Sequence, residues 1–430
     1  MKKKPMTKKL MIKTSLTATV LLLLSVHVSA VPQKQAVLEH YAVLAHAVYE
    51  DSLITARDLQ KAVNQLIAKP TEENLLHART AWRAARVPYQ QSEVYRFGNA
   101  IVDDWEGKVN AWPLDEGLID YVASSYGAES AENPAYRANV IASSNFTFSG
   151  STIDARQITK DLLANTLHEL GGVEANVATG YHAIEFLLWG QDLNGTGPGA
   201  GKRPASDFDA NNCSWKNCVR RAAYLKSATD LLVDDLTWMV AQWVPGGDAR
   251  EGLLGSPIEE GLSTIITGMG SLSYGELAGE RMQLGLLLHD PEEEHDCFSD
   301  NTHYSHYYDA MGIRNIYLGE YRRMDGTMVE GPSLSDLVAA TSSEVDKNLR
   351  NQLDATMTAM HRLVESAKGG EAYDQMIAPG NEAGNARVQA AIDALTTQVR
   401  GIEDVVSTLK LAAIEFEGSG SLNDPEAVFE

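Results

Sequence analysis

An imidazole and a carboxylate lie three residues apart in the apolar run of residues 180–189, as His182 and Glu185. Residues i and i+3 share one face of a helix, so the two side chains can point at the same spot. Charged groups seldom lie among Ile, Phe, Leu and Trp unless something pairs with them. A divalent or trivalent metal ion would satisfy both groups, and so would a hydrogen bond between them. The spacing therefore predicts either a metal site or a structural His–Glu pair.

Two ligands do not complete a metal site, because zinc takes three or four ligands and iron takes more. The sequence contains no H-E-x-x-H motif, which would supply a second histidine and a general base on one helix. Further ligands must therefore come from other segments, and carboxylate-rich ligation favours a hard ion such as ferric iron over zinc. The candidates are Glu93, Asp115, Glu116, Asp120 and Glu174 in the first half of the chain and Glu280, Glu294, His295, Asp300 and His303 in the second.

Each of these candidates also has an ordinary structural interpretation, because acidic residues often cap helices or form ion pairs. The alternatives are helix caps or ion pairs with Arg86 for Asp115 and Asp120, an ion pair with Arg281 or Arg83 for Glu280, and a hydrogen-bonded loop for the group from His295 to His303. The sequence leaves these alternatives open.

The N-terminus indicates where the protein works. Six lysines precede an apolar segment at 16–28, and small residues follow at 28–30. This order is typical of a secretory signal peptide over residues 1–30, and the apolar segment is too short for a membrane span. We therefore expect an exported protein, located in the periplasm or attached peripherally to the outer membrane or cell surface.

The acidic composition limits the classes of partner. The formal net charge is −22, and removal of residues 1–30 takes away six lysines and no acidic residue, which moves the charge to −28. A polyanion such as nucleic acid is therefore not an expected partner. The negative charge attracts cations, although an acidic surface also favours solubility without any bound cation.

Three cysteines in an exported chain indicate a disulfide. Cys213 and Cys218 are five residues apart and form the natural pair, which closes a small loop before a helix. Cys297 is left over, and we expect it to be a buried free thiol.

The periodicity of apolar residues is helical throughout, so we predict an all-α fold. The glycine-rich loop at 194–204 is the best domain boundary. We expect two tandem four-helix-bundle-like domains with minor short β-hairpins. The predicted parts are the signal peptide at 1–30, an N-terminal bundle at 31–204, a C-terminal bundle at 205–415 and a flexible acidic tail at 416–430.

Several stretches together resemble a known family. The core is the segment 176–192, which contains a G-x-H-x-x-E motif formed by Gly180, His182 and Glu185. Similar stretches lie at 111–121, 276–282, 294–303 and 312–321. On these residues the chain resembles the imelysin family, which includes insulin-cleaving proteases and iron-regulated protein A of bacteria, and the resemblance covers nearly the whole chain after residue 30.

The resemblance implies a two-domain, all-helical fold with a four-helix bundle in each domain. It also implies an exported bacterial protein of iron acquisition and a metallopeptidase label. We therefore expect the chain to bind a metal ion, iron first and zinc as the alternative, or an iron chelate, around the G-x-H-x-x-E motif. Membrane-associated iron-uptake components are the expected partners. Two alternatives stay open: a metallopeptidase that uses His182 and Glu185, and a binding protein without metal in which this pair is structural.

Overall fold

Long helices with one apolar face build the structure, as the periodicity predicts. The computed structural model describes residues 1–2, 32–131 and 133–429, so the predicted signal peptide lies outside the described residues apart from its first two. From Pro32 onward the chain forms one compact unit. No helix in these described ranges is long and apolar enough to cross a membrane.

Local signals set the first two helices. α1 (Lys34–Ala68) ends just before Pro70, and α2 (Glu72–Ser92) begins after Thr71, whose hydroxyl oxygen accepts a hydrogen bond from the Asn74 backbone N–H at 3.3 Å. The remaining α-helices are α3 Ala100–Asn110, α4 Glu116–Ile119, α5 Lys160–Leu162, α6 Gly180–Trp189, α7 Cys218–Trp243, α8 Asp248–Gly255, α9 Ile258–Ser271, α10 Leu284–Leu288, α11 Thr302–Leu318, α12 Leu334–Thr341, α13 Ser343–Lys368, α14 Tyr373–Ile377, α15 Glu382–Leu409 and α16 Gly420–Asn423.

Shorter helical turns connect these elements. The 3-10 turns are η1 Glu93–Tyr95, η2 Ser124–Tyr126, η4 Leu170–Gly172, η5 Ala205–Phe208, η7 Pro291–Glu293 and η8 Pro425–Phe429, and the π-helical segments are η3 Leu163–Leu167 and η6 Leu272–Gln283. The all-α prediction is therefore confirmed, with only two small sheets beside the helices.

The two sheets are the short β-hairpins expected from the sequence. β1 (Asn145–Phe148) pairs antiparallel with β2 (Ser151–Asp154), and β3 (Glu320–Arg322) pairs antiparallel with β4 (Met328–Glu330). The second hairpin turns through residues 323–327.

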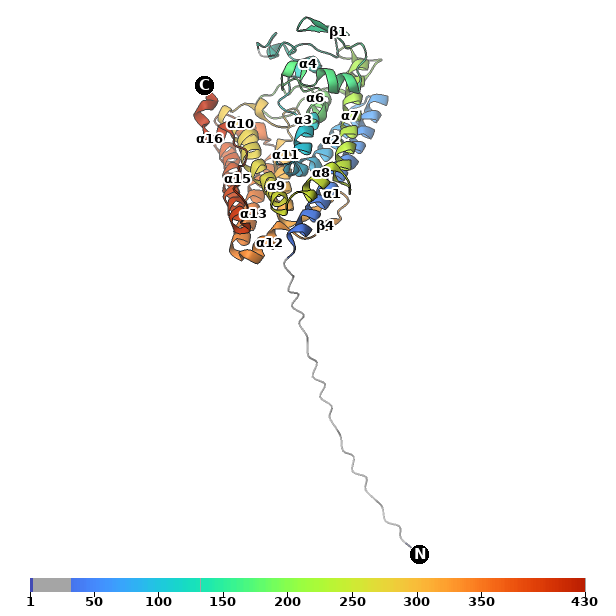
Figure 1. Cartoon of the computed structure of the whole chain (residues 1–430). Helices are drawn as coiled ribbons and strands as arrows, with labels where there is room; N and C mark the ends of the chain where they lie inside the picture. The colour runs from blue at the N-terminus through green and yellow to red at the C-terminus, as the bar shows by residue number, and fades with distance from the viewer. Residues whose placement is uncertain (3–31, 132, 430) are drawn as a thin grey trace. The chain divides into compact units, whose positions relative to one another are not determined.

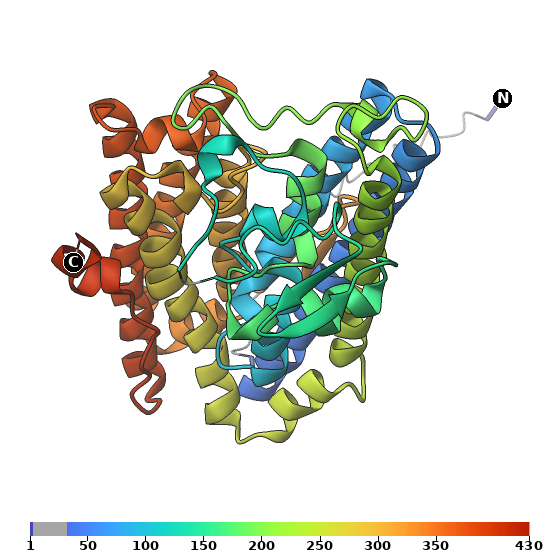
Figure 2. The same cartoon turned by 90° about the horizontal axis from the view of Figure 1, so that it is seen from above.

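Two groups of long helices lie on opposite sides of the compact unit. In Figure 1, α1, α2 and α7 lie at the right and α13 and α15 at the left, with α9 and α11 between them. Figure 2 shows the same two groups on opposite sides when seen from above. α1 packs against α7, and α2 packs against α11, so helices from before and after residue 204 share one core. The division into domains at 204 stays a prediction.

The C-terminal segment, for which the sequence predicts a flexible tail, lies against α9 and η6. The ring of Phe416 packs on Gly270, and the Glu417 backbone N–H donates to the Ser271 hydroxyl oxygen at 3.1 Å. Ser421 donates to the Gly279 carbonyl oxygen at 2.9 Å. Glycines on α9 and η6 leave room for this contact, which polar composition alone does not reveal.

The disulfide is the one that the sequence predicts, whereas the free thiol is half-buried and not fully buried as expected. The structure joins Cys213 to Cys218 in a disulfide at the start of α7 and leaves Cys297 as a free thiol.

Candidate metal centre

Helix α6 positions the two residues of the motif, and its first residue explains why the motif begins with glycine. Gly180 has a φ of +79°, a region that favours glycine. A Cβ atom there would collide with the Val109 carbonyl group at the end of α3. The Thr179 hydroxyl donates to the Lys108 carbonyl oxygen at 2.8 Å and holds the same junction. The glycine therefore lets α6 begin in direct contact with α3, which sets the direction of His182.

The motif side chains converge on one helical face. His182 Nδ1 lies 3.1 Å from Glu185 Oε2, and the two side chains are 1% and 0% exposed. The other carboxylate oxygen of Glu185 accepts a hydrogen bond from the Ser299 backbone N–H at 3.0 Å. Glu185 therefore both orients His182 and ties α6 to the loop that precedes α11.

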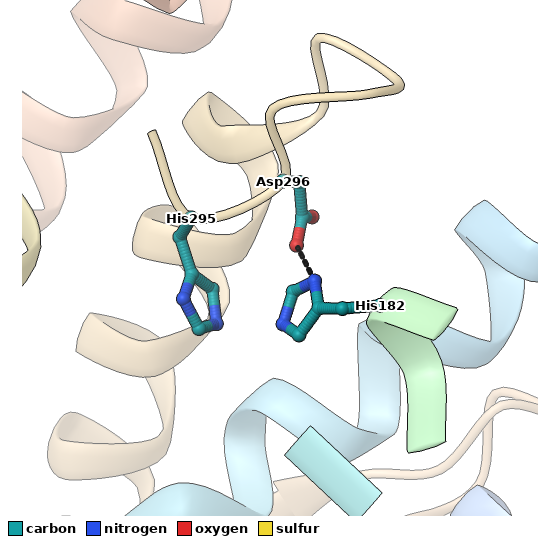
Figure 3. Close-up of side chains that lie close together, drawn as sticks. All are labelled: His182, His295 and Asp296. Carbon is teal, nitrogen blue, oxygen red and sulfur yellow. Dashed lines mark ion pairs between the residues drawn. The ribbon is translucent and has the colours of Figure 1, made fainter. Parts of the chain in front are cut away.

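That loop brings a second histidine and a second carboxylate to His182. Figure 3 shows His295 and Asp296 on the loop, facing His182 on α6. The His182 and His295 ring centroids are 4.7 Å apart, and Asp296 Oδ1 lies 3.9 Å from His182 Nδ1. One ligand atom from each of the three residues lies within 4.8 Å of the others, and all three are buried. We call His182, His295 and Asp296 the triad.

The triad buries nitrogen atoms that have no protein partner. Among the described residues, neither His182 Nε2 nor either ring nitrogen of His295 has a hydrogen-bond partner. Buried polar atoms are rarely left unpaired, because desolvation costs about 1–3 kcal/mol for each. When Glu185 holds His182 through Nδ1, Nε2 is the atom left to bind a metal, which is the usual carboxylate–histidine–metal arrangement. The donor set of the triad therefore fits a metal ion.

Arg86 supplies the fixed positive charge beside the triad. Its guanidinium donates to Asp296 Oδ1 at 2.8 Å and to Asn110 Oδ1 at 2.6 Å, and it is buried. Asn301 donates to the other oxygen of Asp296 at 2.8 Å, and Ser305 donates to the same atom. Burial opposes ionisation of Asp296, but Arg86 and these hydrogen-bond donors hold its pKa below the usual value.

The remaining charges show an excess of negative charge. Burial first, and then the charge of Asp296, raise the pKa of Glu185 well above its usual value. Burial and Arg86 lower the pKa of His182 to about 3, and burial and Arg281 lower the pKa of His295 well below its usual value. The imidazoles are therefore neutral, which is the form that binds metals, while two carboxylates face one arginine. A proton on Glu185 or a cation restores the balance.

A cavity lined by residues of α2 and α11 lies near the triad, although no residue of the triad lines it. It has a volume of about 260 Å³ and is lined in part by Arg83, Arg86, Asn301 and Tyr304. Arg86 and Asn301 both donate to Asp296, so the cavity ends beside the triad. A larger cavity of about 1090 Å³ shares the lining residues Val87 and Tyr308 with it.

The other carboxylates proposed from the sequence lie elsewhere. Glu93 pairs with Arg281 at 2.7 Å and accepts from Asn110 at 3.4 Å, so it reaches the triad only through Asn110 and Arg86. Three others have protein partners: Asp115 accepts a hydrogen bond from Asn133, Glu116 accepts one from Gln191, and Asp120 pairs with Arg203 and Arg221. The last two, Glu174 and Glu280, are exposed. Arg86 pairs with Asp296, not with Asp115 or Asp120 as one interpretation expected.

Sequence reasoning included His295 among the candidates but did not include Asp296. The available signal was that both lie in the family-like stretch 294–303, directly beside each other. His306 on α11 was also not considered, although it is 0% exposed and neither of its ring nitrogens has a partner among the described residues. Glu294 and Asp300 lie in a separate cluster of carboxylates together with Asp374. His303 is buried on α11.

The chain is similar in sequence and in fold to known proteins. The family model described as Imelysin matches residues 45–402. Over 64 residues the chain is 39% identical to iron-regulated protein A of Synechococcus elongatus, a match that covers 15% of this chain and only 18% of that relative's length. The fold is similar to that of a crystal structure from Parabacteroides distasonis described as an iron-regulated protein A precursor, with a TM-score of 0.61, 18% identity, and coverage of 89% of this chain and 97% of the other.

Proposed function

This chain belongs to the imelysin family, and from that premise we propose that it is an exported protein of bacterial iron acquisition that binds a metal ion at the triad. Iron is the first candidate and zinc the alternative. The names of the relatives, iron-regulated protein A in both cases, point to an iron-related role.

One observation carries this proposal: the triad buries three imidazole nitrogens that have no hydrogen-bond partner in the described ranges, next to the Asp296 carboxylate. A hydrogen-bonded interior would not leave these atoms unpaired. A mixed nitrogen and oxygen donor set suits iron and zinc. Glu185 would orient His182, and Arg86 would orient Asp296, so both ligands have the supporting hydrogen bonds that metal sites require.

An iron chelate is the second form that the metal can take. The cavity beside the triad carries Arg83 and Arg86, and the larger cavity that shares Val87 and Tyr308 with it is lined by Arg322 and Arg362. Guanidinium groups bind carboxylates and other planar anions through paired hydrogen bonds. An anionic chelate of iron therefore matches these cavities better than a cationic ligand would.

The test is metal binding by wild type and by His182→Ala and His295→Ala. We expect protein purified without chelators to contain metal, and we expect each variant to bind ferric iron at least roughly tenfold more weakly in calorimetric titration. His77→Ala is the matched control, because His77 is exposed on α2. Equal affinity in all four proteins would mean that the metal binds elsewhere or that the triad binds no metal.

The structural alternative makes a different prediction for His182→Ala. A metal ligand acts mainly in the bound state, whereas loss of a structural hydrogen bond would leave Glu185 unpaired and cost about 1–3 kcal/mol of folding stability. Calorimetric melting of the metal-free proteins separates the two. A much lower melting temperature together with unchanged iron binding would favour the structural pair.

The peptidase alternative needs a metal-bound water and a free general base. In the structure Glu185 is engaged by His182 and by the Ser299 backbone, which favours a supporting role over a base. Cleavage of a peptide by wild type but not by His295→Ala would support the enzyme. Cleavage that survives both histidine variants would point to a contaminating protease.

We also propose that the protein works in the periplasm or attached to the outer membrane or cell surface, together with membrane-associated iron-uptake components. The expected signal peptide supports this location, and the acidic surface makes nucleic acid an unsuitable partner. Fractionation of cells that express the full chain tests the location directly: the protein is expected outside the cytoplasm, shortened by about 30 residues.

A further inference from the structure

The loop that carries His295 and Asp296 has a second set of side chains that takes no part in the triad. Glu294 and Asp300 come from this loop, and Asp374 comes from α14. One carboxylate oxygen from each lies within 4.8 Å of the others. Glu294 and Asp374 are 1% exposed, and Asp300 is half-buried, so the cluster has a single half-open side.

Four carboxylate oxygens of this cluster lack a hydrogen-bond partner among the described residues. Both carboxylate oxygens of Asp374, Oε1 of Glu294 and Oδ1 of Asp300 have no hydrogen bond within the described parts of the chain. None of the three carboxylates forms an ion pair there, in contrast to Asp296 and Glu93, which each face an arginine. A carboxylate buried in this way is costly to keep charged unless it takes up a proton or a cation meets it.

A neighbouring hydroxyl gives a separate indication. Tyr373 is 0% exposed, and its hydroxyl has no hydrogen-bond partner among the described residues. Tyr373 directly precedes Asp374 on α14. α14 therefore contributes a buried hydroxyl and a buried carboxylate, both without a hydrogen-bond partner in the described parts of the chain.

We propose that Glu294, Asp300 and Asp374 form a second cation site that takes a hard, oxygen-preferring divalent cation, with calcium as the probe. Calcium binds oxygens at 2.3–2.6 Å, so two ligands on opposite sides of the ion are about 4.6–5.2 Å apart. The three carboxylate oxygens lie within 4.8 Å of one another, close enough to share one ion. The site contains no nitrogen or sulfur, so it disfavours zinc. Water from the side of Asp300 would complete the coordination.

The site would also brace the triad. Glu294 and His295 are adjacent, and Asp300 follows Ser299, whose backbone holds Glu185. A cation between this loop and α14 would hold the loop on one side, while the hydrogen bond from Ser299 to Glu185 holds it to α6. The site itself is independent of the proposed function, because none of its three ligands belongs to the triad.

The experiment follows the melting temperature and calcium binding of the chain without residues 1–30, after treatment with a chelator, in 0.15 M salt. We expect calcium to raise the melting temperature of wild type, and zinc to raise it less. Asp374→Asn should abolish the calcium-induced rise and weaken calcium binding by roughly tenfold or more, since calcium affinity depends on ligand charge. Without calcium, Asp374→Asn should melt no lower than wild type, because it relieves repulsion.

Three further proteins make the result decisive. Asp354→Asn removes an acidic side chain that is 64% exposed and should keep the calcium response, which controls for the acidity of the whole protein. His182→Ala should also keep it, so failure of the triad and failure of this site are distinguishable. Asp300→Asn, at the half-open side, repeats the test if Asp374→Asn does not fold. A wild type that calcium does not stabilise, or a response that survives Asp374→Asn or Asp300→Asn, would overturn the proposal.

Discussion

Arg86 decides the charge of the buried centre at the scale of single residues. It is the cation that faces Asp296, while Glu185 and the neutral His182 add no compensating positive charge. Its position also depends on neighbouring rings, since its guanidinium lies over Tyr181 at 5.1 Å from the ring centroid. A buried ion pair of this kind is weak support for stability in itself, but removal of one partner is costly because the other charge stays buried.

We therefore predict that Arg86→Met lowers the free energy of unfolding by about 3–5 kcal/mol, because Asp296 loses its charge partner. Arg350→Met is the matched control: Arg350 pairs with Asp346 on one helix and is 45% exposed, so its loss should cost about 0–1 kcal/mol. Urea denaturation of both variants measures the difference. Similar small losses in the two would mean that Asp296 does not depend on Arg86 for its charge.

At the scale of elements, the start of α6 is the feature that links backbone conformation to the site. Gly180 combines a left-handed φ with close contact to the Val109 carbonyl group. The first one and a half turns of α6, roughly, then carry His182 and Glu185 to the loop that precedes α11. The packing of α6 on α3 therefore explains the glycine of the motif. The contacts of His182 with His295 and Asp296, and of Glu185 with the Ser299 backbone, explain the histidine and the glutamate.

Gly180→Ala should destabilise the protein by at least about 1–3 kcal/mol, since the left-handed φ is strained for alanine and the added methyl group collides with α3. Metal affinity at the triad should fall as well, because α6 must shift. The control is Gly252→Ala on α8, where a Cβ atom meets nothing within 4 Å; it should be neutral or stabilising by about 0.5–1 kcal/mol. Thermal melting and iron titration compare the two, and equal behaviour would refute the packing explanation.

At the scale of the whole molecule, helices from both halves of the chain share one core and jointly build the centre. The triad takes one residue from α6 and two from the loop before α11, and Arg86 comes from α2. α1 packs on α7 and α2 on α11, across the predicted boundary at 204. Residues 32–430 accordingly form one compact unit.

This packing predicts one cooperative unfolding transition for the whole chain after residue 30. Scanning calorimetry should give a calorimetric enthalpy equal to the van't Hoff enthalpy, as expected when no part unfolds separately. Separate expression of residues 31–204 and 205–415 provides the complementary measurement, and neither piece should fold alone. Two resolved transitions, or a stably folded piece, would instead support two domains.

What the sequence determined by itself is mostly local. The 3.6-residue period predicts helices, Thr71 and Pro70 mark the junction of α1 and α2, and the i,i+3 spacing places His182 beside Glu185. The family resemblance likewise rests on local motifs and is confirmed over residues 45–402. Such features depend on neighbouring residues, whose distances the backbone geometry sets in advance.

Only the tertiary structure decided which distant residues meet. Asp296 lies 114 positions after His182, and its partner Arg86 lies 210 positions before it. The sequence contains many acidic residues that could serve as ligands, and the packing of the helices decides where each one lies. Asp120 pairs with Arg203 and Arg221, while Asp296 pairs with Arg86 and belongs to the triad. The physical reason is that long-range contacts depend on how whole helices pack, and no spacing rule encodes that packing.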